Sequence, residues 1–254
     1  MIYTEQQGHG PDIVLIHGWG MHGGIWSEIA EHLAKTHRVT VVDLPGHGKS
    51  TMLPGGFDLQ RLARAILDEV PQPAIWLGWS LGGMVATQAA LLQPPAIRRL
   101  LLVASLPQFS QSDDWPEAMP RGTLASFANN LAKDYAITLK RFLALQVRGA
   151  DNERDLLRLI QKQVASRPHA DPEALRLGLE ILRSANLRPQ LSQLQCPVNI
   201  ILGDRDMLVP VAAGHALHAL LPQAICKIIP AAGHAPFLSH QNVFLSELDV
   251  LLDQ

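Results

Sequence analysis

Hydrophobic residues gather in six short runs along the chain, and most of these runs are followed by a helical pattern. The runs are "DIVLI" (12–16), "RVTVV" (38–42), "AIWLG" (74–78), "RLLLVA" (99–104), "VNIIL" (198–202) and "ICKII" (225–229). Short apolar runs of this kind are typical of buried strands. Their alternation with helical segments predicts an α/β fold, with a mostly parallel central sheet and helices on both faces. We expect "MIYTEQQ" (1–7) to add an edge strand.

The strand pattern is missing from one long stretch, between about Pro107 and Pro189. Helical periodicity replaces it, in three or four segments: one near 123–146, one over 151–165 and one over 172–184. We therefore predict a core formed by residues 1–107 and 189–254, interrupted by a helical lid at 108–188. From Lys133 to Arg188 there are 11 Lys or Arg and 7 Asp or Glu, a local charge of +4 that leaves −6 for the rest. The predicted lid is thus basic on an acidic body.

The composition of the whole chain narrows the classes of protein that it can be. A chain of 254 residues with 47% hydrophobic residues can bury a substantial core, and a net charge of −2 gives no general attraction to nucleic acid. No run approaches the roughly 20 apolar residues of a membrane span, and the N-terminus lacks the features of a signal peptide. Two cysteines, Cys196 and Cys226, fit buried reduced thiols better than a disulfide framework. We therefore expect a cytoplasmic protein without a nucleic-acid or membrane partner.

The segment "GWSLG" (78–82) carries the strongest chemical signal, because it places Ser80 between a predicted strand and a helical pattern. Gly-x-Ser-x-Gly in this strand, turn and helix context is the nucleophile elbow of serine hydrolases. The turn strains the serine backbone, and small residues two positions to either side let strand and helix pass closely. An ordinary glycine-rich turn is the alternative. We predict that Ser80 is a nucleophile.

A serine hydroxyl is a poor nucleophile until a base removes its proton. His234, in "PAAGHAPF", follows the last predicted strand and would project at the carboxyl edge of the sheet, as Ser80 does. His17, in "IHGWG", is the alternative base, although its loop lies where backbone donors are needed. We predict that His234 is the base.

An acidic residue must orient the histidine, and "LGDRDMLVP" offers Asp204 and Asp206 just past a strand. Asp43, in "VVDLPGHGKS", is a third candidate, but a turn-forming role suits it better. With Asp206, the chain order becomes Ser80, Asp206, His234, which is the order associated with α/β-hydrolases.

An oxyanion hole needs two fixed donors where negative charge develops. The backbone amide of Leu81 directly follows the nucleophile, and that of Trp19 lies on the loop after the first core strand, which supplies the second amide in hydrolases of this kind. Trp19 could instead form only a wall of the pocket, and both roles are compatible.

Taken together, "LIHGWG", "DLPGHGKS", "GWSLGG", "GDRDMLVP" and "AAGHAPF" resemble the α/β-hydrolase superfamily over essentially the whole chain. The "MLVP" that follows Asp206 resembles the acid loop of that superfamily, which favours Asp206 over Asp204. A closer resemblance is to the BioH family, carboxylesterases that cleave pimeloyl-acyl carrier protein methyl ester in biotin synthesis. It is carried by "AIWLGWSLGG", "RFLALQ", "GLEIL" and "GHAPFLSH".

The BioH resemblance implies where substrate and carrier protein bind. The implied substrate pocket consists of Trp19, Ser80, Leu81, Phe142, Leu143, Ala144, Leu145 and Gln146. The implied docking residues for the acidic carrier protein are Arg141, Arg154 and Arg158, and Ile137 replaces one arginine of the family. Independently, Arg154, Arg158 and Lys162 recur every four residues and would form a basic stripe on one helix. Such a stripe is often only a solvated face, but the local charge and the resemblance favour docking.

We therefore predict a serine carboxylesterase that hydrolyses the methyl ester of pimeloyl-acyl carrier protein without a metal or organic cofactor. We expect acyl carrier protein as its partner and a monomeric state. One alternative is a broad-specificity carboxylesterase or a carbon–carbon bond hydrolase that uses the same residues. Another is a ligand receptor with a hydrolase fold and little turnover, which a serine-reactive phosphonate would distinguish from an enzyme.

Overall fold

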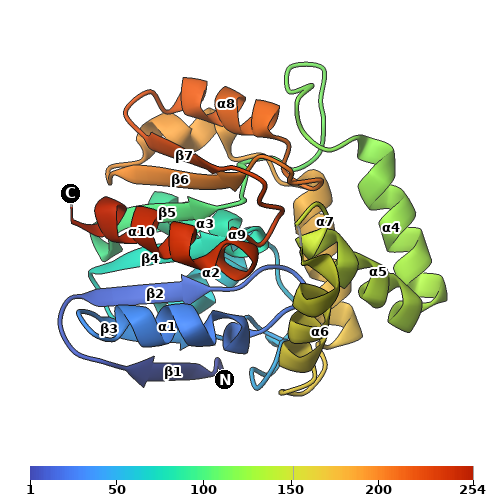
Figure 1. Cartoon of the computed structure of the whole chain (residues 1–254), viewed down its shortest axis with the longest axis horizontal. Coiled ribbons are helices and arrows are strands. Elements are labelled where there is room, and N and C mark those ends of the chain that lie inside the picture. The colour runs from blue at the N-terminus through green and yellow to red at the C-terminus, as the bar shows by residue number, and fades with distance from the viewer. Residues whose placement is uncertain (151, 254) are drawn as a thin grey trace.

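A seven-stranded sheet forms the centre of the molecule, in the order β1-β3-β2-β4-β5-β6-β7 (Figure 1). The structure is a computed structural model that describes residues 1–150 and 152–253. Its strands are β1 Thr4–Gln7, β2 Asp12–Ile16, β3 Arg38–Val42, β4 Ala74–Trp79, β5 Ile97–Val103, β6 Val198–Gly203 and β7 Ile225–Ile229. Strands β2 to β7 are parallel, whereas β1 pairs with β3 in the antiparallel sense at the edge. All six predicted strands and the predicted edge strand are confirmed.

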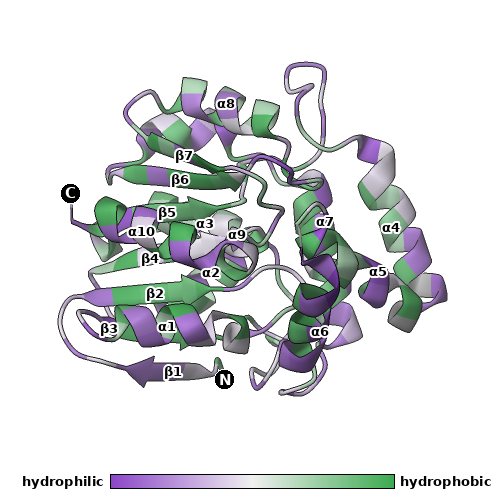
Figure 2. Cartoon of the chain, viewed as in Figure 1, coloured by the Kyte–Doolittle hydropathy of each residue, from purple (hydrophilic) through white to green (hydrophobic). Residues whose placement is uncertain are grey.

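Helices cover both faces of this sheet, as predicted. In Figure 1, α1 (Ser27–Leu33) and α10 (Gln241–Leu252) lie in front, with α2 (Leu59–Leu67) and α3 (Leu81–Leu92) behind. Helix α8 (Val211–Leu220) packs on β6 and β7. Shorter elements complete the core: η1 Gly23–Trp26, η2 Pro94–Ala96, η3 Arg188–Gln193 and α9 Pro236–Ser239. The central strands are hydrophobic along their length while the helices also carry polar residues (Figure 2), as expected for a parallel sheet buried on both faces.

Within the described part of the chain, four α-helices follow β5 and precede β6 in the sequence, and they lie beside the carboxyl ends of the parallel strands (Figure 1). They are α4 Arg121–Lys133, α5 Tyr135–Val147, α6 Glu153–Val164 and α7 Pro172–Ser184. Of the described helices, none is both long and apolar enough to cross a membrane.

The segment predicted near 123–146 is confirmed as helical, but it is divided into two helices, α4 and α5. The chain breaks at Asp134, whose side chain accepts a hydrogen bond from the Ile137 amide at 3.0 Å and so caps α5. The helix predicted over 151–165 corresponds to α6, although Asp151 lies outside the described residues. The helix predicted over 172–184 is confirmed as α7.

Candidate active site

Ser80 occupies the tight turn between β4 and α3. Its backbone has φ 55° and ψ −119°, in a region that non-glycine residues rarely adopt. Two hydrogen bonds hold this conformation, one from the Ser80 amide to the Val103 carbonyl at 2.9 Å and one from Ser105 Oγ to the Ser80 carbonyl at 2.7 Å. The surrounding core therefore compensates for the strain of the turn.

The glycines around Ser80 are required by close backbone contacts. A Cβ atom on Gly78 would lie 2.3 Å from the carbonyl oxygen of Gly82, and one on Gly82 would lie 2.4 Å from that of Ile16. A larger residue at either position would push α3 away from the strands. The spacing of "GWSLG" thus has the steric origin that the sequence predicted.

Asp206 and His234 form a buried pair at the carboxyl edge of the sheet. His234 Nδ1 donates to Asp206 Oδ2 at 2.7 Å, and the two side chains are 1% and 0% exposed. The other oxygen, Asp206 Oδ1, accepts from the amides of Leu208 at 2.7 Å and Val209 at 2.9 Å, which fixes the carboxylate. Because Nδ1 carries the proton, Nε2 of neutral His234 carries a lone pair. This Nε2 is buried and has no hydrogen-bond partner among the described residues.

The alternative acids and the alternative base lie in other surroundings. Asp204 is exposed. Asp43 is buried, but its carboxylate binds the amides of Gly23 and Lys49 and the guanidinium of Arg167. His17 Nδ1 donates to the Gly18 carbonyl at 2.7 Å, and its Nε2 accepts from the Leu44 amide at 2.9 Å. Burial, with His47 nearby, lowers the pKa of His17 to about 3, so that its imidazole stays neutral.

Trp79 supports the loop that carries His234. Its indole Nε1 donates to the His234 carbonyl at 2.8 Å, and its ring lies 5.6 Å from the imidazole and 5.0 Å from the ring of Phe237. In the sequence, Trp79 stands out only as part of the "AIWLGWSLGG" motif that carries the BioH resemblance. No local signal indicates its contact with His234, since the two residues are 155 positions apart.

The two predicted oxyanion donors adjoin Ser80. Leu81 is the first residue of α3, so its N–H has no acceptor within the helix and lies at the positive end of the helix dipole. On the other loop, a Cβ atom on Gly18 would lie 3.2 Å from Ser80 Cβ, so the backbone leading to Trp19 passes close to the serine. The Trp19 side chain turns toward α7, where its Nε1 donates to the Leu175 carbonyl at 2.8 Å.

A small, mostly apolar cavity of about 50 Å³ opens beside Ser80 and His234. Of the residues implied by resemblance, Trp19, Ser80, Phe142 and Leu145 line it, and the Trp19 indole lies edge-on to the Phe142 ring at 4.8 Å. The other implied pocket residues have different surroundings: Leu81 and Leu143 belong to the buried core, Ala144 is half-buried, and the Gln146 carbonyl accepts from the Ala235 amide at 3.1 Å.

Much of the cavity wall was not identified from the sequence. It includes Phe109 and Met119 after β5, Thr123, Leu124 and Phe127 on α4, Leu179 and Leu182 on α7, and Leu208 beside Asp206. The segment "GLEIL" contains Leu179 and Leu182 and carries part of the BioH resemblance, so this part of the wall could have been identified from the sequence. Among the described residues, no group of three or more His, Cys, Asp or Glu could hold a metal ion.

Comparisons with known proteins show the family to which the chain belongs. A family model for the alpha/beta hydrolase fold matches residues 11–241. A pimeloyl-[acyl-carrier protein] methyl ester esterase of Methylococcus capsulatus is 48% identical over 239 residues, which cover 94% of this chain and 93% of that protein. The chain belongs to this esterase family of α/β-hydrolases.

Another member of the esterase family, from Aliivibrio fischeri, is 42% identical over 253 residues and is matched over 100% of this chain and 98% of its own length. Among solved structures, an esterase from Exiguobacterium antarcticum superposes with a TM-score of 0.92 at 23% identity, covering 100% of this chain and 96% of its own. A bromoperoxidase from Bacillus anthracis reaches 0.91 at 23% identity, covering 100% and 95%. The solved structures therefore establish the shared α/β-hydrolase fold.

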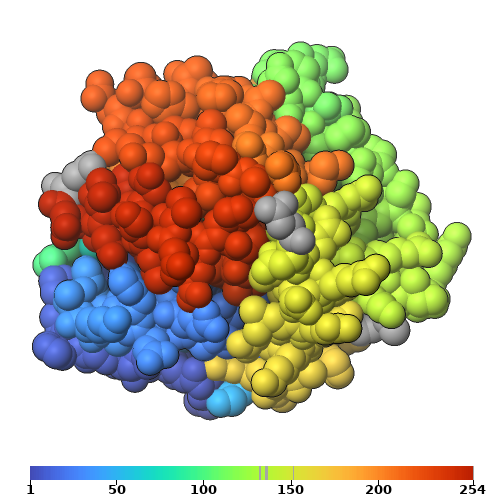
Figure 3. Space-filling view, viewed as in Figure 1, coloured from blue at the N-terminus to red at the C-terminus, as the bar shows by residue number. Residues whose placement is uncertain are grey.

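In this esterase family member, the surface formed by α5 and α6 carries the arginines that the sequence singled out. Arg141 on α5 and Arg154 and Arg158 on α6 are all exposed. Leu156 and Ile160 of α6 face inward and are buried, as the helical spacing predicts. Arg158 also pairs with Asp155 at 3.1 Å, at the surface. Figure 3 shows this part of the chain, in yellow, exposed on the face in view.

Proposed function

We propose that this protein hydrolyses the methyl ester of pimeloyl-acyl carrier protein to pimeloyl-acyl carrier protein and methanol, as a step of biotin synthesis. The observation that carries the proposal is the buried Asp206–His234 pair beside the cavity that Ser80 lines, because His234 Nε2 has no hydrogen-bond partner among the residues that the structure describes. The choice of substrate rests on relatives of that name, at 48% and 42% identity over nearly the full chain.

The reaction begins with attack of Ser80 Oγ on the ester carbonyl, while His234 Nε2 takes the hydroxyl proton. Asp206 keeps the proton on Nδ1 and stabilises the imidazolium that forms. Negative charge on the carbonyl oxygen is stabilised by the amides of Leu81 and Trp19. His234 then gives its proton to the leaving methoxy group, which departs as methanol and leaves an acyl-enzyme on Ser80.

Water completes the cycle by attacking the acyl-enzyme, with His234 again as base and then as acid. The carboxylate released is the distal carboxyl of the pimeloyl group. The thioester that joins this group to the carrier survives because only the methyl end reaches Ser80.

The helices over the site must move to admit an acyl chain. A cavity of about 50 Å³ is well below the ~300–1,000 Å³ typical of ligand pockets. Helices α4 and α5 supply Thr123, Leu124, Phe127, Phe142 and Leu145 to its wall. We therefore propose that residues 108–188 act as a lid and that the α4–α5 side opens for substrate.

The carrier protein would dock on the basic surface of the lid. Arg141, Arg154 and Arg158 are exposed there and suit an acidic partner. Ile137 is 51% exposed on α5 and offers an apolar contact where the family has another arginine. The proposal includes a monomeric, cytoplasmic enzyme, which sedimentation and cell fractionation can test.

The decisive experiment measures methanol released from pimeloyl-acyl carrier protein methyl ester, beside hydrolysis of p-nitrophenyl butyrate, at low and moderate salt. We expect strong preference for the carrier-linked ester, weakened by salt because docking is electrostatic. Turnover of the small ester alone would retain the serine hydrolase mechanism and refute the proposed substrate. Absence of both activities, with no labelling of Ser80 by a phosphonate, would refute the enzyme itself.

A further inference from the structure

The loop of residues 17–24, here called the oxyanion loop, is held by contacts from both the core and the lid. On the core side, the Gly23 amide donates to Asp43 Oδ1 at 2.6 Å. On the lid side, the Trp19 indole donates to the Leu175 carbonyl of α7, and His22 Nε2 contacts the Gln163 carbonyl of α6 at 2.8 Å. Since His22 Nδ1 accepts from the Gly24 amide at 3.1 Å, the proton lies on Nε2, which therefore donates to Gln163.

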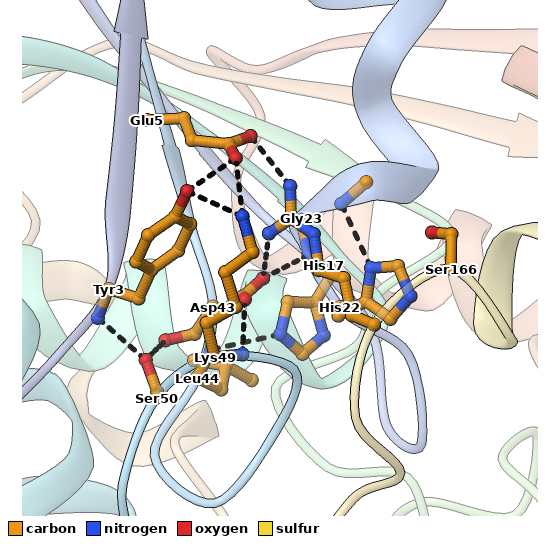
Figure 4. Close-up of polar contacts among 12 residues, drawn as sticks. Tyr3, Glu5, His17, His22, Gly23, Asp43, Leu44, Lys49, Ser50 and Ser166 are labelled. Atoms are coloured by element: carbon orange, nitrogen blue, oxygen red, sulfur yellow. Dashed lines mark hydrogen bonds and ion pairs between the residues drawn. The ribbon is translucent and has the colours of Figure 1, made fainter.

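Asp43 is the core residue whose side chain binds this loop at Gly23. Figure 4 shows it at the centre of a polar cluster, with Glu5 and Tyr3 of the β1 side on one flank and His22 on the other. Its side chain is fully buried. Oδ2 accepts from the Lys49 amide at 2.8 Å, so Asp43 joins the oxyanion loop to the turn after β3.

The charge of Asp43 is balanced by an arginine from the lid. Arg167 lies between α6 and α7, and its side chain is only 9% exposed. Its Nη1 donates at 2.8 Å to Asp43 Oδ1, the same oxygen that accepts from Gly23. Its Nη2 donates to Glu5 Oε2 at 2.6 Å, and Glu5 is 44% exposed. The Arg167 guanidinium thus pairs with two carboxylates, that of buried Asp43 and that of partly exposed Glu5.

Loss of Arg167 would leave Asp43 as a buried carboxylate without its arginine partner. Burial by itself raises the pKa of Asp43, and His17, the amides of Lys49 and Gly23, and Arg167 together hold that pKa below its usual value. A buried charge that loses its partner either takes up a proton or moves toward water. Either change weakens the Asp43–Gly23 hydrogen bond, which fixes the oxyanion loop four residues beyond Trp19.

We propose that Arg167 is a positioning residue for catalysis: through Asp43 and Gly23 it fixes the oxyanion loop, and so the Trp19 amide that receives the developing oxyanion. This inference rests on the proposed function, because it takes the Trp19 amide as an oxyanion donor. The ion pair between Arg167 and Asp43 joins the lid to the core, and its two residues are 124 positions apart in the sequence. The lid is therefore part of the catalytic geometry as well as a cover for the substrate.

The test compares Arg167→Ala with the wild type on p-nitrophenyl butyrate, with kcat normalised to active sites titrated by a phosphonate. We expect kcat to fall about 10- to 100-fold with KM changed less than about threefold, since complete loss of one oxyanion donor costs ~10²–10³ in kcat. The inhibition constant of an alkyl trifluoromethyl ketone, which forms a tetrahedral adduct with Ser80, should rise in parallel with the loss of kcat/KM. Arg167→Lys keeps the charge and should recover most of the lost kcat.

Glu5→Gln is the matched control, because it removes the other ion pair of Arg167 and leaves Asp43 paired. It should keep kcat within about twofold of the wild type. The inference is overturned if Arg167→Ala retains wild-type kcat per active site, if Glu5→Gln lowers kcat equally, or if inhibition by the ketone is unchanged. Failure of the wild type to turn over any ester would instead refute the proposed function.

Discussion

The hydrogen bond from Trp79 to the His234 carbonyl can be isolated with a pair of matched substitutions. Trp76 and Trp79 lie on the same strand, β4, and both are almost fully buried. Trp79 Nε1 donates to His234, whereas Trp76 Nε1 has no partner among the described residues. Changing either residue to Phe removes the same ring atoms, but only Trp79→Phe removes a hydrogen bond.

The expected magnitudes follow from this difference. We take the packing loss as about 1–2 kcal/mol for each substitution. Trp79→Phe also leaves a buried carbonyl unpaired, which adds about 1–3 kcal/mol to the loss of unfolding free energy. A shift of the His234 loop should lower kcat about 10- to 100-fold, because misplacement by ~1 Å costs on the order of 10²-fold.

Urea unfolding measures the free energies, and hydrolysis of p-nitrophenyl butyrate per titrated active site measures kcat. We expect Trp79→Phe to be the less stable and much the less active variant, with Trp76→Phe close to the wild type in kcat. Equal kcat values for the two variants would show that Trp79 does not position His234. Equal loss of stability would show that its hydrogen bond contributes nothing measurable.

Three further predictions concern the proposed nucleophile, the proposed docking surface and the buried histidines. Ser80→Ala should lower kcat by about 10³- to 10⁶-fold and abolish phosphonate labelling, because Ser80, His234 and Asp206 act as a unit. Activity near that of the wild type in a methanol-release assay would exclude Ser80 as the nucleophile. The double variant Arg154→Ala with Arg158→Ala should raise KM for the carrier-linked ester at low salt and leave KM for a short free ester unchanged. The control variant Arg176→Ala with Arg183→Ala, on α7, should change neither KM. Equal loss of activity on both substrates in the α6 variant would contradict docking. Burial lowers the pKa of His17 to about 3 and of His47 to about 4 in the folded protein. As the pH falls, both histidines are therefore protonated in the unfolded chain before they are protonated in the folded protein. The free energy of unfolding should therefore fall by about 2–3 kcal/mol between pH 7 and pH 5.5, and equal urea midpoints at the two pH values would contradict this.

The fold could be predicted from the sequence because parallel strands buried on both faces are continuous apolar runs. The break between α4 and α5 could not, since Asp134 interrupts a helical pattern that continues on both sides. In the structure, its extended backbone and the hydrogen bond from the Ile137 amide to its side chain show that it begins a new helix. A capping residue inside a longer amphipathic pattern is a weak signal by itself.

Some residues of the candidate site could likewise be predicted from the sequence, and others could not. Ser80 and His234 were found because their motifs are local, and the structure brings them to one cavity. The choice of Asp206 over Asp204 needed the resemblance, because both acids follow β6 within three residues. The ion pair between Asp43 and Arg167 could not be predicted, since its partners are far apart in sequence and each resembles a common surface or turn residue.

The placement of α4 has a consequence for engineering new specificities. One side of this helix supplies Thr123, Leu124 and Phe127 to the cavity, while many of its other described side chains are exposed. A library that varies these three positions would reshape the cavity proposed to bind the acyl chain without altering the sheet, the elbow or the oxyanion loop. Because α4 is a single continuous segment, recombination with the corresponding helix of another esterase could exchange substrate preference as one cassette.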